Sequence, residues 1–207
     1  MNMLAVASPA IKLLFERVGR AEVRNRPALL QRGGAGAVIV CNHAGWADSL
    51  WMSYAVYPRP LRHMSKRELF SSPLARWVLE QGGSIPVDRA EPSPSTIKSA
   101  VELLRNGELL LIFPAGTRQE NARFKRGAAT IALHAAVPIV PALYEGPKDM
   151  QMTHLLGRPR ISVTFGAVIP TAGLPVDRCT ASELTQQLQT SIEGLRTTPG
   201  SLNCAAA

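Results

Sequence analysis

Residues 38–52, VIVCNHAGWADSLWM, run from four apolar residues into Asn42 and His43, with Asp48 five positions after the histidine. Five residues along one helix set two side chains roughly 140° apart, and five along a strand put them on opposite faces. The two side chains can therefore meet only if His43 lies on a loop after a strand and Asp48 begins the next helix, where the helix dipole favours a carboxylate. The spacing alone also fits an unrelated loop histidine and an ordinary helix-start aspartate.

The surrounding pattern supports a strand, a loop and a helix. Gly45 offers the flexible backbone that such a loop needs, and Leu50, Trp51 and Tyr54 recur at helical spacing. Further short apolar runs predict strands at 61–64, 84–87, 108–113, 137–144 and 161–169, in addition to 37–41. Helical patterns fall between most of them; the clearest are 96–105, capped by Ser95 and ending near Gly107, and 128–136.

This alternation predicts an α/β fold: a single domain with a mostly parallel or mixed central sheet flanked by helices. Ligands of such sheets gather outside the carboxyl ends of the strands, which is where His43 falls. We expect an N-terminal amphipathic helix within residues 1–20, docked on the domain, and the domain itself at 21–196. Its last helix opens with a capping box at 180–183, and residues 197–207 form a flexible tail.

Composition narrows the class of partner. The chain of 207 residues is 46% hydrophobic, and 23 Lys and Arg against 15 Asp and Glu give a formal charge of +8. This charge favours phosphate groups, an acidic lipid surface or nucleic acid. Nucleic acid is the weakest of the three, because aromatics are only 5% of the chain and no interleaved basic and aromatic array is present.

Cysteine usage and hydropathy bear on the compartment. The three cysteines, Cys41, Cys179 and Cys204, are far apart and form no CxxC pair, which fits a reducing, cytosolic setting. No apolar run approaches the roughly 18 residues of a spanning helix, and no signal-peptide pattern opens the chain. We therefore expect a protein without a transmembrane helix that stays on the side of the membrane where it is made.

Three further stretches place polar or glycine residues after a strand: GGSIPVDR (82–89), LIFPAGTRQENARFKRGAA (111–129) and VPIVPALYEG (137–146). The prolines of the third indicate an edge strand or a shaped wall. Each arginine taken alone fits an ordinary surface position. Together with His43 and Asp48, arginines at strand ends on one edge predict a base beside an anion-binding pocket, which suits deprotonation of a hydroxyl on a phosphate-bearing molecule.

The order and spacing of NHAGWAD, GGSIPVDR, FPAGTR and VPIVPALY resemble the four motifs of the glycerolipid acyltransferase family, the 1-acyl-sn-glycerol-3-phosphate acyltransferase-like enzymes. The resemblance covers about residues 38–145. It implies a glycerol-3-phosphate acyltransferase-like fold. It also implies an O-acyltransferase of phospholipid biosynthesis, which moves a fatty acyl group from acyl-CoA or acyl carrier protein to the free hydroxyl of lysophosphatidate and yields phosphatidate.

The resemblance also implies roles for individual residues. His43 is the general base, and Asp48 accepts a hydrogen bond from its other ring nitrogen, so that no covalent acyl-enzyme is required. The substrate-binding residues that the resemblance implies are Lys66, Arg89, Gly116, Thr117 and Arg118. It implies no metal and no cofactor beyond the thioester donor. The remaining expected partners are a lysophospholipid acceptor and an anionic membrane surface at the cytoplasmic face, to which the protein is peripheral.

One position departs from the family pattern. The third motif usually reads FPEGTR, and this chain has Ala115 in place of the glutamate. A methyl group can neither accept a hydrogen bond nor orient Arg118, which leaves open another acceptor such as a lyso-aminolipid, a weakly active or non-catalytic lipid-surface homologue, or an introduced substitution. A metal hydrolase built on His43, Asp48 and His63 is a more distant alternative, because no spacing supplies a third ligand.

Overall fold

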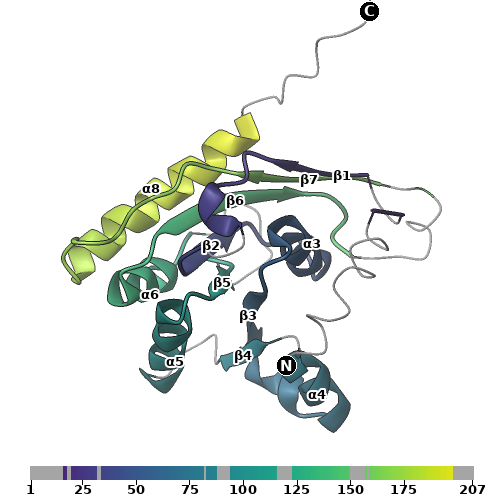
Figure 1. The fold of residues 1–207 in the computed structure, drawn as a ribbon, viewed down its shortest axis with the longest axis horizontal. Helices are drawn as coiled ribbons and strands as arrows, with labels where there is room; N and C mark the ends of the chain where they lie inside the picture. Colours follow the sequence, from purple (N-terminus) through teal and green to yellow (C-terminus); the bar gives the residue numbers. More distant parts are fainter. Residues whose placement is uncertain are drawn as a thin grey trace, which may run out of the picture.

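Seven strands form one sheet in the order β1-β7-β6-β2-β5-β3-β4 (Figure 1). The computed structural model describes residues 16–17, 20–31, 34–81, 83–87, 94–115, 123–149, 157 and 159–197. The strands are β1 (Arg20–Arg24), β2 (Ala37–Cys41), β3 (Leu61–Lys66), β4 (Ser84–Val87), β5 (Leu109–Ile112), β6 (Ile139–Glu145) and β7 (Arg160–Phe165).

The sheet is mixed. Strands β6, β2, β5, β3 and β4 are parallel to their neighbours, whereas β7 pairs antiparallel with β6 and parallel with β1. The carboxyl ends of five strands therefore lie along one edge of the sheet, and β2 is among the central ones. The predicted fold class, a single α/β domain with a mixed sheet flanked by helices, is confirmed.

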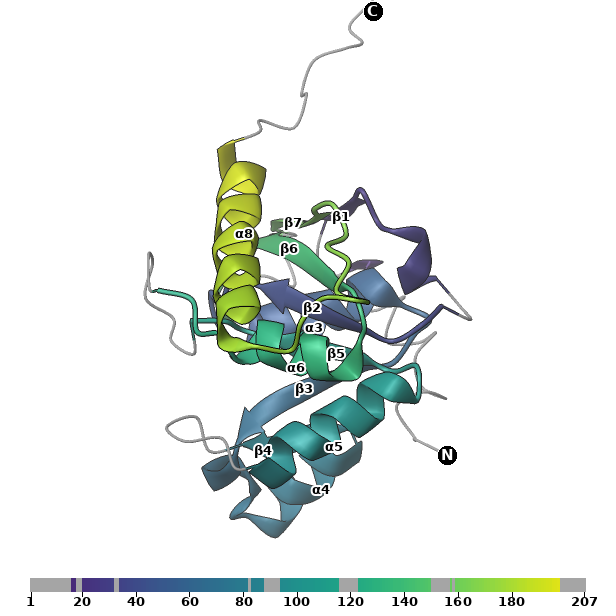
Figure 2. The ribbon, with the colours of Figure 1, turned by 90° about the vertical axis from the view of Figure 1, so that its left-hand side faces the viewer.

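Helices cover both faces of the sheet. The helical elements are η1 (Ala28–Leu30), α3 (Ala47–Val56), η2 (Arg67–Phe70), α4 (Pro73–Gln81), α5 (Pro94–Arg105), α6 (Gly127–Ala135) and α8 (Arg178–Thr197). Figures 1 and 2 show α5, α6 and α8 together on one face and α3 on the other, with α4 beside β4 at the end of the sheet.

All five residues of β2 are buried, as expected for an inner strand with both faces covered. Val38 and Val40 pack into the hydrophobic cluster formed with α5, α6 and α8, and Ile39 and Cys41 pack into the cluster formed with α3. The strand therefore joins the two halves of the core, and its carboxyl end has little freedom to move.

The sequence missed one strand, and the edge-strand interpretation of the prolines is wrong. Strand β1 was not predicted, because its exposed and charged residues carry no apolar run. The prolines of 137–146 do not mark an edge, since β6 lies between β7 and β2. The carbonyl of Pro141 accepts a hydrogen bond from the N–H of Gly166. The pairing of β6 with β7 begins only at the next residue, where Ala142 lies opposite Phe165. The missing N–H of Pro141 thus falls beyond the end of that ladder.

Two helices also begin earlier in the chain than predicted. The last helix begins at Arg178, two residues before the expected capping box, and the carboxylate of Asp177 accepts the N–H of Thr180 at 2.8 Å. Helix α5 begins at Pro94, so Ser95 lies inside the first turn instead of capping it. Proline is favoured at the first helical position, where its missing N–H costs nothing. The predicted end of α5 near Gly107 is confirmed by the positive φ of that glycine.

The two chain ends fall mostly outside the described residues. Glu16 and Arg17 are helical, but the rest of the predicted helix within residues 1–20 is not described, except for Arg20, which opens β1. The predicted tail likewise lies outside, apart from Thr197, the last residue of α8. Among the described helices, none is long and apolar enough to cross a membrane.

His63 on β3 ties that strand to α3. The hydroxyl of Ser53 donates to the carbonyl of Ser49 at 3.0 Å, so the Nε2–H of His63 must donate to the Ser53 oxygen at 3.1 Å. The other ring nitrogen, Nδ1, is buried without a hydrogen-bond partner. His63 thus does not join His43 and Asp48 as a third metal ligand, and no cluster of three metal-ligating side chains occurs within the described part of the chain.

The titration of His63 predicts a specific loss of stability in acid. Burial lowers the pKa of His63 to about 4, and the negative charge of Asp48 only partly offsets that effect. The unfolded chain binds this proton near pH 6.5, so the free energy of unfolding falls as the pH drops from about 6.5 to about 4, by roughly 1 kcal/mol per pH unit. Urea denaturation over this range measures the slope.

The variant H63Q keeps an N–H that can reach Ser53 and removes the titration, so we expect a shallower slope than in the wild type. H134Q, at an exposed histidine on α6, is the matched control and should keep the wild-type slope. Equal slopes in H63Q and wild type would contradict the assignment.

Candidate active site

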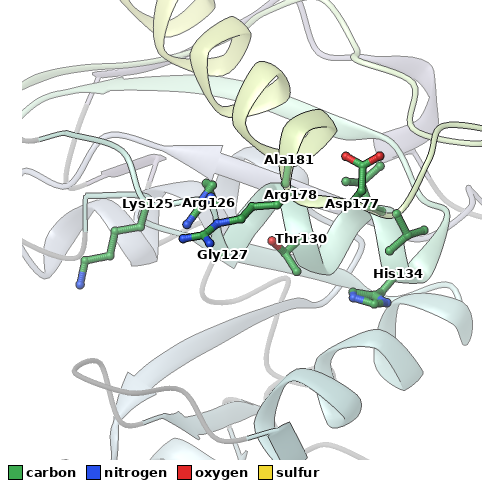
Figure 3. Close-up of a pocket in the computed structure, with 10 residues that line it drawn as sticks. Lys125, Arg126, Gly127, Thr130, His134, Asp177, Arg178 and Ala181 are labelled. Atoms are coloured by element: carbon green, nitrogen blue, oxygen red, sulfur yellow. The ribbon is translucent and has the colours of Figure 1, made fainter.

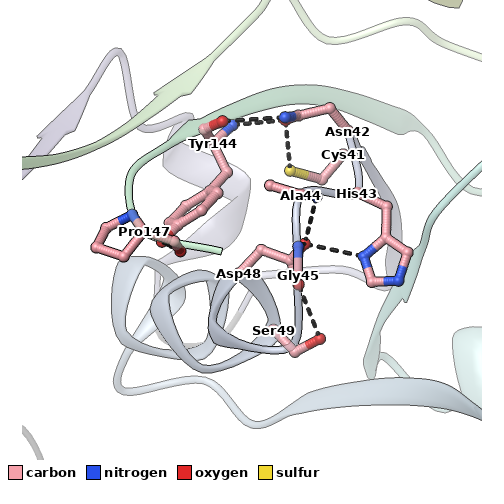
Figure 4. A network of polar contacts seen from close by, with 9 residues as sticks. All are labelled: Cys41, Asn42, His43, Ala44, Gly45, Asp48, Ser49, Tyr144 and Pro147. Carbon is pink, nitrogen blue, oxygen red and sulfur yellow. Dashed lines mark hydrogen bonds and ion pairs between the residues drawn. The ribbon is translucent and has the colours of Figure 1, made fainter. Parts of the chain in front are cut away.

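His43 and Asp48 meet as the spacing predicted. His43 lies two residues beyond β2, Asp48 lies in the first turn of α3, and His43 Nδ1 donates to Asp48 Oδ2 at 2.9 Å (Figure 4). The Asp48 side chain is fully buried and the His43 side chain is 7% exposed. Nδ1 must carry the proton in this pair because a carboxylate can only accept. The same Oδ2 atom therefore sets the tautomer of the imidazole.

The backbone of the loop supplies further donors to Asp48. The N–H groups of Ala44 and Gly45 also point to Oδ2, at 2.9 and 3.1 Å, and the hydroxyl of Ser49 lies 3.3 Å from Oδ1. A buried carboxylate needs such partners to remain ionised at low cost. The loop and the helix start are consequently fastened to each other through one side chain.

Gly45 is required for a different reason from the one expected. It is not among the glycines with positive φ, but a Cβ at this position would lie 1.8 Å from the carbonyl oxygen of Lys148. That carbonyl also accepts the N–H of Ala47 at 3.2 Å. Close approach of the 147–149 segment, and not backbone flexibility, explains the glycine.

The sequence pattern predicts no role for Asn42, and the structure shows that its side chain tethers the loop. Its side-chain amide donates to the carbonyl of Tyr144 at 3.0 Å and accepts the N–H of Tyr144 at 2.7 Å (Figure 4). The side chain thus imitates a peptide group and extends the pairing of β2 with β6 beyond Cys41. This second tether fixes the residue immediately before His43. An amide directly after an apolar strand is the signal that could have indicated it.

The ring of Phe113 stacks on the imidazole of His43, with centroids 4.2 Å apart and an interplanar angle of 21°. Phe113 follows β5, the neighbour of β2 in the sheet. Its carbonyl-side neighbour Pro114 is buried. The imidazole is therefore held at its edge by Asp48 and across its face by an aromatic ring, so its orientation is well determined.

Two other reactive groups near this pair remain protonated. Burial, together with the charge of Asp48, raises the pKa of the Cys41 thiol well above its usual range, and the same two causes raise the pKa of Tyr144. The Cys41 thiol donates to Asn42 Oδ1 at 3.4 Å, and the Tyr144 hydroxyl donates to the carbonyl of Pro147 at 2.7 Å. Neither group is thus suited to act as nucleophile or base at neutral pH.

The predicted substrate-binding residues are described only in part. Lys66 is the last residue of β3, so its backbone lies at the same sheet edge as His43, but its side chain is not described. Arg89 follows β4, and Gly116, Thr117 and Arg118 follow β5; all four lie outside the described residues. Ala115, three positions after β5, is described and half-buried. The topology therefore brings the carboxyl ends of β2, β3, β4 and β5, the strands that lead into these residues, to one edge of the sheet.

The arrangement has the chemistry of an oriented base. No described residue hydrogen-bonds Nε2 of His43, the ring nitrogen that is free to take a proton. The buried Asp48 charge stabilises the imidazolium that would form, as in the histidine and aspartate pair of serine hydrolases. The site can thus activate a hydroxyl group delivered to the carboxyl edge of the sheet.

Comparisons with known proteins identify the family of this chain. Residues 19–145 match the family model described as Acyltransferase. A 1-acyl-sn-glycerol-3-phosphate acyltransferase of Bacillus subtilis is 36% identical over 171 residues, which cover 79% of this chain and 85% of that protein. The enzyme of the same name from Streptococcus pneumoniae is 37% identical over 130 residues, covering 62% of this chain and 48% of that protein.

A solved structure shows the same fold. The 1-acyl-sn-glycerophosphate (LPA) acyltransferase PlsC from Thermotoga maritima superposes with a TM-score of 0.65 at 17% sequence identity, covering 93% of this chain and 81% of that one. The family model spans more than half of the chain, and the Bacillus subtilis relative is similar over most of its length. This chain belongs to the acyltransferase family.

Proposed function

We propose that this acyltransferase moves a fatty acyl group from a thioester donor to the free hydroxyl of lysophosphatidate and yields phosphatidate. The observation that carries the proposal is the imidazole of His43, oriented by Asp48 through Nδ1 and unbonded at Nε2 among the described residues. The relatives from Bacillus subtilis and Streptococcus pneumoniae bear the name of this activity.

The proposed reaction uses this arrangement of His43 and Asp48. Nε2 of His43 takes the proton of the acceptor hydroxyl as the oxygen attacks the thioester carbonyl, and Asp48 stabilises the resulting imidazolium. The carbon–sulfur bond then breaks, and the departing thiolate takes the proton back from Nε2. No acyl-enzyme forms, and the proposal requires no cofactor, because the thioester donor is already activated. Acyl-CoA and acyl carrier protein both satisfy this chemistry.

Cationic side chains at the neighbouring strand ends complete the proposed site. Lys66 ends β3, and Arg89 and Arg118 follow β4 and β5, whose carboxyl ends share an edge with β2. Guanidinium groups match the oxygens of a phosphate, and we propose that the backbone at Gly116 and Thr117 approaches the ligand closely. We assign these five residues to the phosphate of the acceptor.

We further propose peripheral attachment to an anionic membrane at the cytoplasmic face. Leu69 of η2 and Leu74 and Trp77 of α4 are 52%, 73% and 49% exposed, although large apolar side chains are ordinarily buried. Leu74 and Trp77 stand three residues apart on one face of α4, and tryptophan is favoured at membrane interfaces. The net charge of +8 attracts acidic headgroups to the protein.

Replacement of the proposed base gives the first test. We expect H43A to lower lysophosphatidate-dependent thiol release by a factor of about 10² to 10⁴, the usual contribution of a general base. D48N, which keeps the shape of the side chain, should lower the rate by a similar factor because the imidazole loses its required tautomer. Thiol release with and without acceptor measures both effects.

Unchanged circular dichroism and urea midpoints serve as the control for folding in both variants. Near-wild-type turnover by folded H43A would exclude the histidine as base. Absence of turnover by the wild type on every lysolipid and both donor types would instead support the non-catalytic lipid-surface protein.

Ala115 favours a second candidate acceptor, a lyso-aminolipid. For a lysophosphatidate enzyme we expect A115E to raise kcat/KM by about tenfold, because a carboxylate at this half-buried position can accept a hydrogen bond from the acceptor and orient Arg118. A115Q, of the same length without the charge, is the matched control and should give a smaller gain. A loss in A115E, combined with wild-type turnover that does not depend on the acceptor phosphate, would identify the lyso-aminolipid instead.

A further inference from the structure

A groove between α6 and the start of α8 lies outside the site described above. Its volume is about 570 Å³, and its lining comes from the two residues before α6, from the length of α6 itself and from the residues around the start of α8 (Figure 3). Three cationic side chains, those of Lys125, Arg126 and Arg178, gather at one end, and Leu133, His134 and Val176 line the remainder. The groove is thus cationic at one end, and at the other end it combines apolar side chains with the polar side chains of His134 and Asp177.

The three cations at this end of the groove have no acidic partner among the residues that the structure describes. Within the described residues, no carboxylate forms an ion pair with Lys125, Arg126 or Arg178. Figure 3 shows the guanidinium of Arg178 extending toward Arg126, where like charges repel unless an anion lies between them. Among the described residues of the lining, Asp177 is the only carboxylate; it stands toward the His134 end and already accepts the N–H of Thr180.

The start of α6 adds a second source of positive potential. The side chain of the N-cap residue, Arg126, does not cap this helix, and no other described side chain bonds its first N–H groups. In α8, by contrast, Asp177 supplies the cap. Gly127 exposes the backbone of α6 at this point, since an added Cβ would meet no atom within 4 Å. Uncapped N–H groups beside three cations are suited to phosphate oxygens.

A short series of bonds and contacts connects the cationic end of the groove with His43. The N–H of Lys125 donates to the carbonyl of Pro114 at 2.9 Å, and Pro114 directly follows Phe113, whose ring stacks on His43. With Cα atoms 3.8 Å apart along the chain, this path is on the order of 15 Å long. A pantetheine arm is about as long as four or five residues of extended peptide, roughly 15 Å, which matches the length of this path.

We propose that this groove binds the nucleotide end of a coenzyme A thioester, with its phosphates at Lys125, Arg126 and Arg178 and its adenine between Leu133, Val176 and His134. The inference rests on the proposed function, for which it names the acyl donor. A groove that combines three cations with the apolar side chains of Leu133 and Val176 suits a phosphorylated nucleoside. An acidic protein surface would need the charges spread over a wider, flatter face.

The test compares two arginines of one helix. We expect R178E to lower kcat/KM for oleoyl-CoA by about tenfold or more, and R196E, an exposed arginine in the last turn of α8, to leave it unchanged. G127L fills the groove from a position with open space around Cβ and should also lower kcat/KM for oleoyl-CoA. With oleoyl-pantetheine, which lacks the nucleotide, wild type and R178E should have about the same kcat/KM.

The outcomes separate this inference from the proposed function. Equal losses in R178E and R196E, or equal losses with oleoyl-CoA and oleoyl-pantetheine, would overturn the nucleotide site while leaving the acyl transfer intact. Turnover only with acyl carrier protein, slowed in R178E, would show that the groove receives a protein and would also overturn it. If the wild type transfers no acyl group, calorimetry with adenosine 3′,5′-bisphosphate decides alone: binding weakened in R178E supports the site, and no binding overturns it.

Discussion

The buried carboxylate of Asp48 is the constraint on which the rest of the site depends. One oxygen atom accepts three N–H groups, from the His43 ring and from the backbone of Ala44 and Gly45. Burying an ion is costly unless such donors surround it, so the loop, the helix start and the imidazole can keep this charge buried only in one mutual arrangement. Orientation of the base is therefore a consequence of electrostatics in the core.

The sheet extends this constraint to the neighbouring elements. Strand β2 is buried on both faces, and the Asn42 amide continues its pairing to Tyr144 on β6. On the other side β5 brings Phe113 against the imidazole. Because these strands are parallel, their carboxyl ends meet at one edge, and residues far apart in the chain can serve one substrate. The basic groove beside α6 begins at the same loop that follows β5.

Much of the fold and of the central pair could be predicted from the sequence. The apolar runs located six of the seven strands, and the five-residue spacing placed His43 on a loop and Asp48 in a helix. The charged strand β1 was missed because it lacks an apolar pattern and becomes a strand only by pairing with β7. The roles of Asn42, Phe113 and Gly45 were also not predicted, since each depends on a residue about seventy or more positions away in the chain.

The elements and the candidate chemistry could be read from the chain alone, because they rest on local periodicity, on the strand that ends in Asn42 and His43, and on the excess of positive charge. The place of β6 in the sheet, the need for glycine at position 45 and the meeting of Lys125, Arg126 and Arg178 at one groove became visible only in the folded molecule. Periodicity and caps are properties of neighbouring residues, whereas close backbone approaches and gathered charges arise from packing between distant segments.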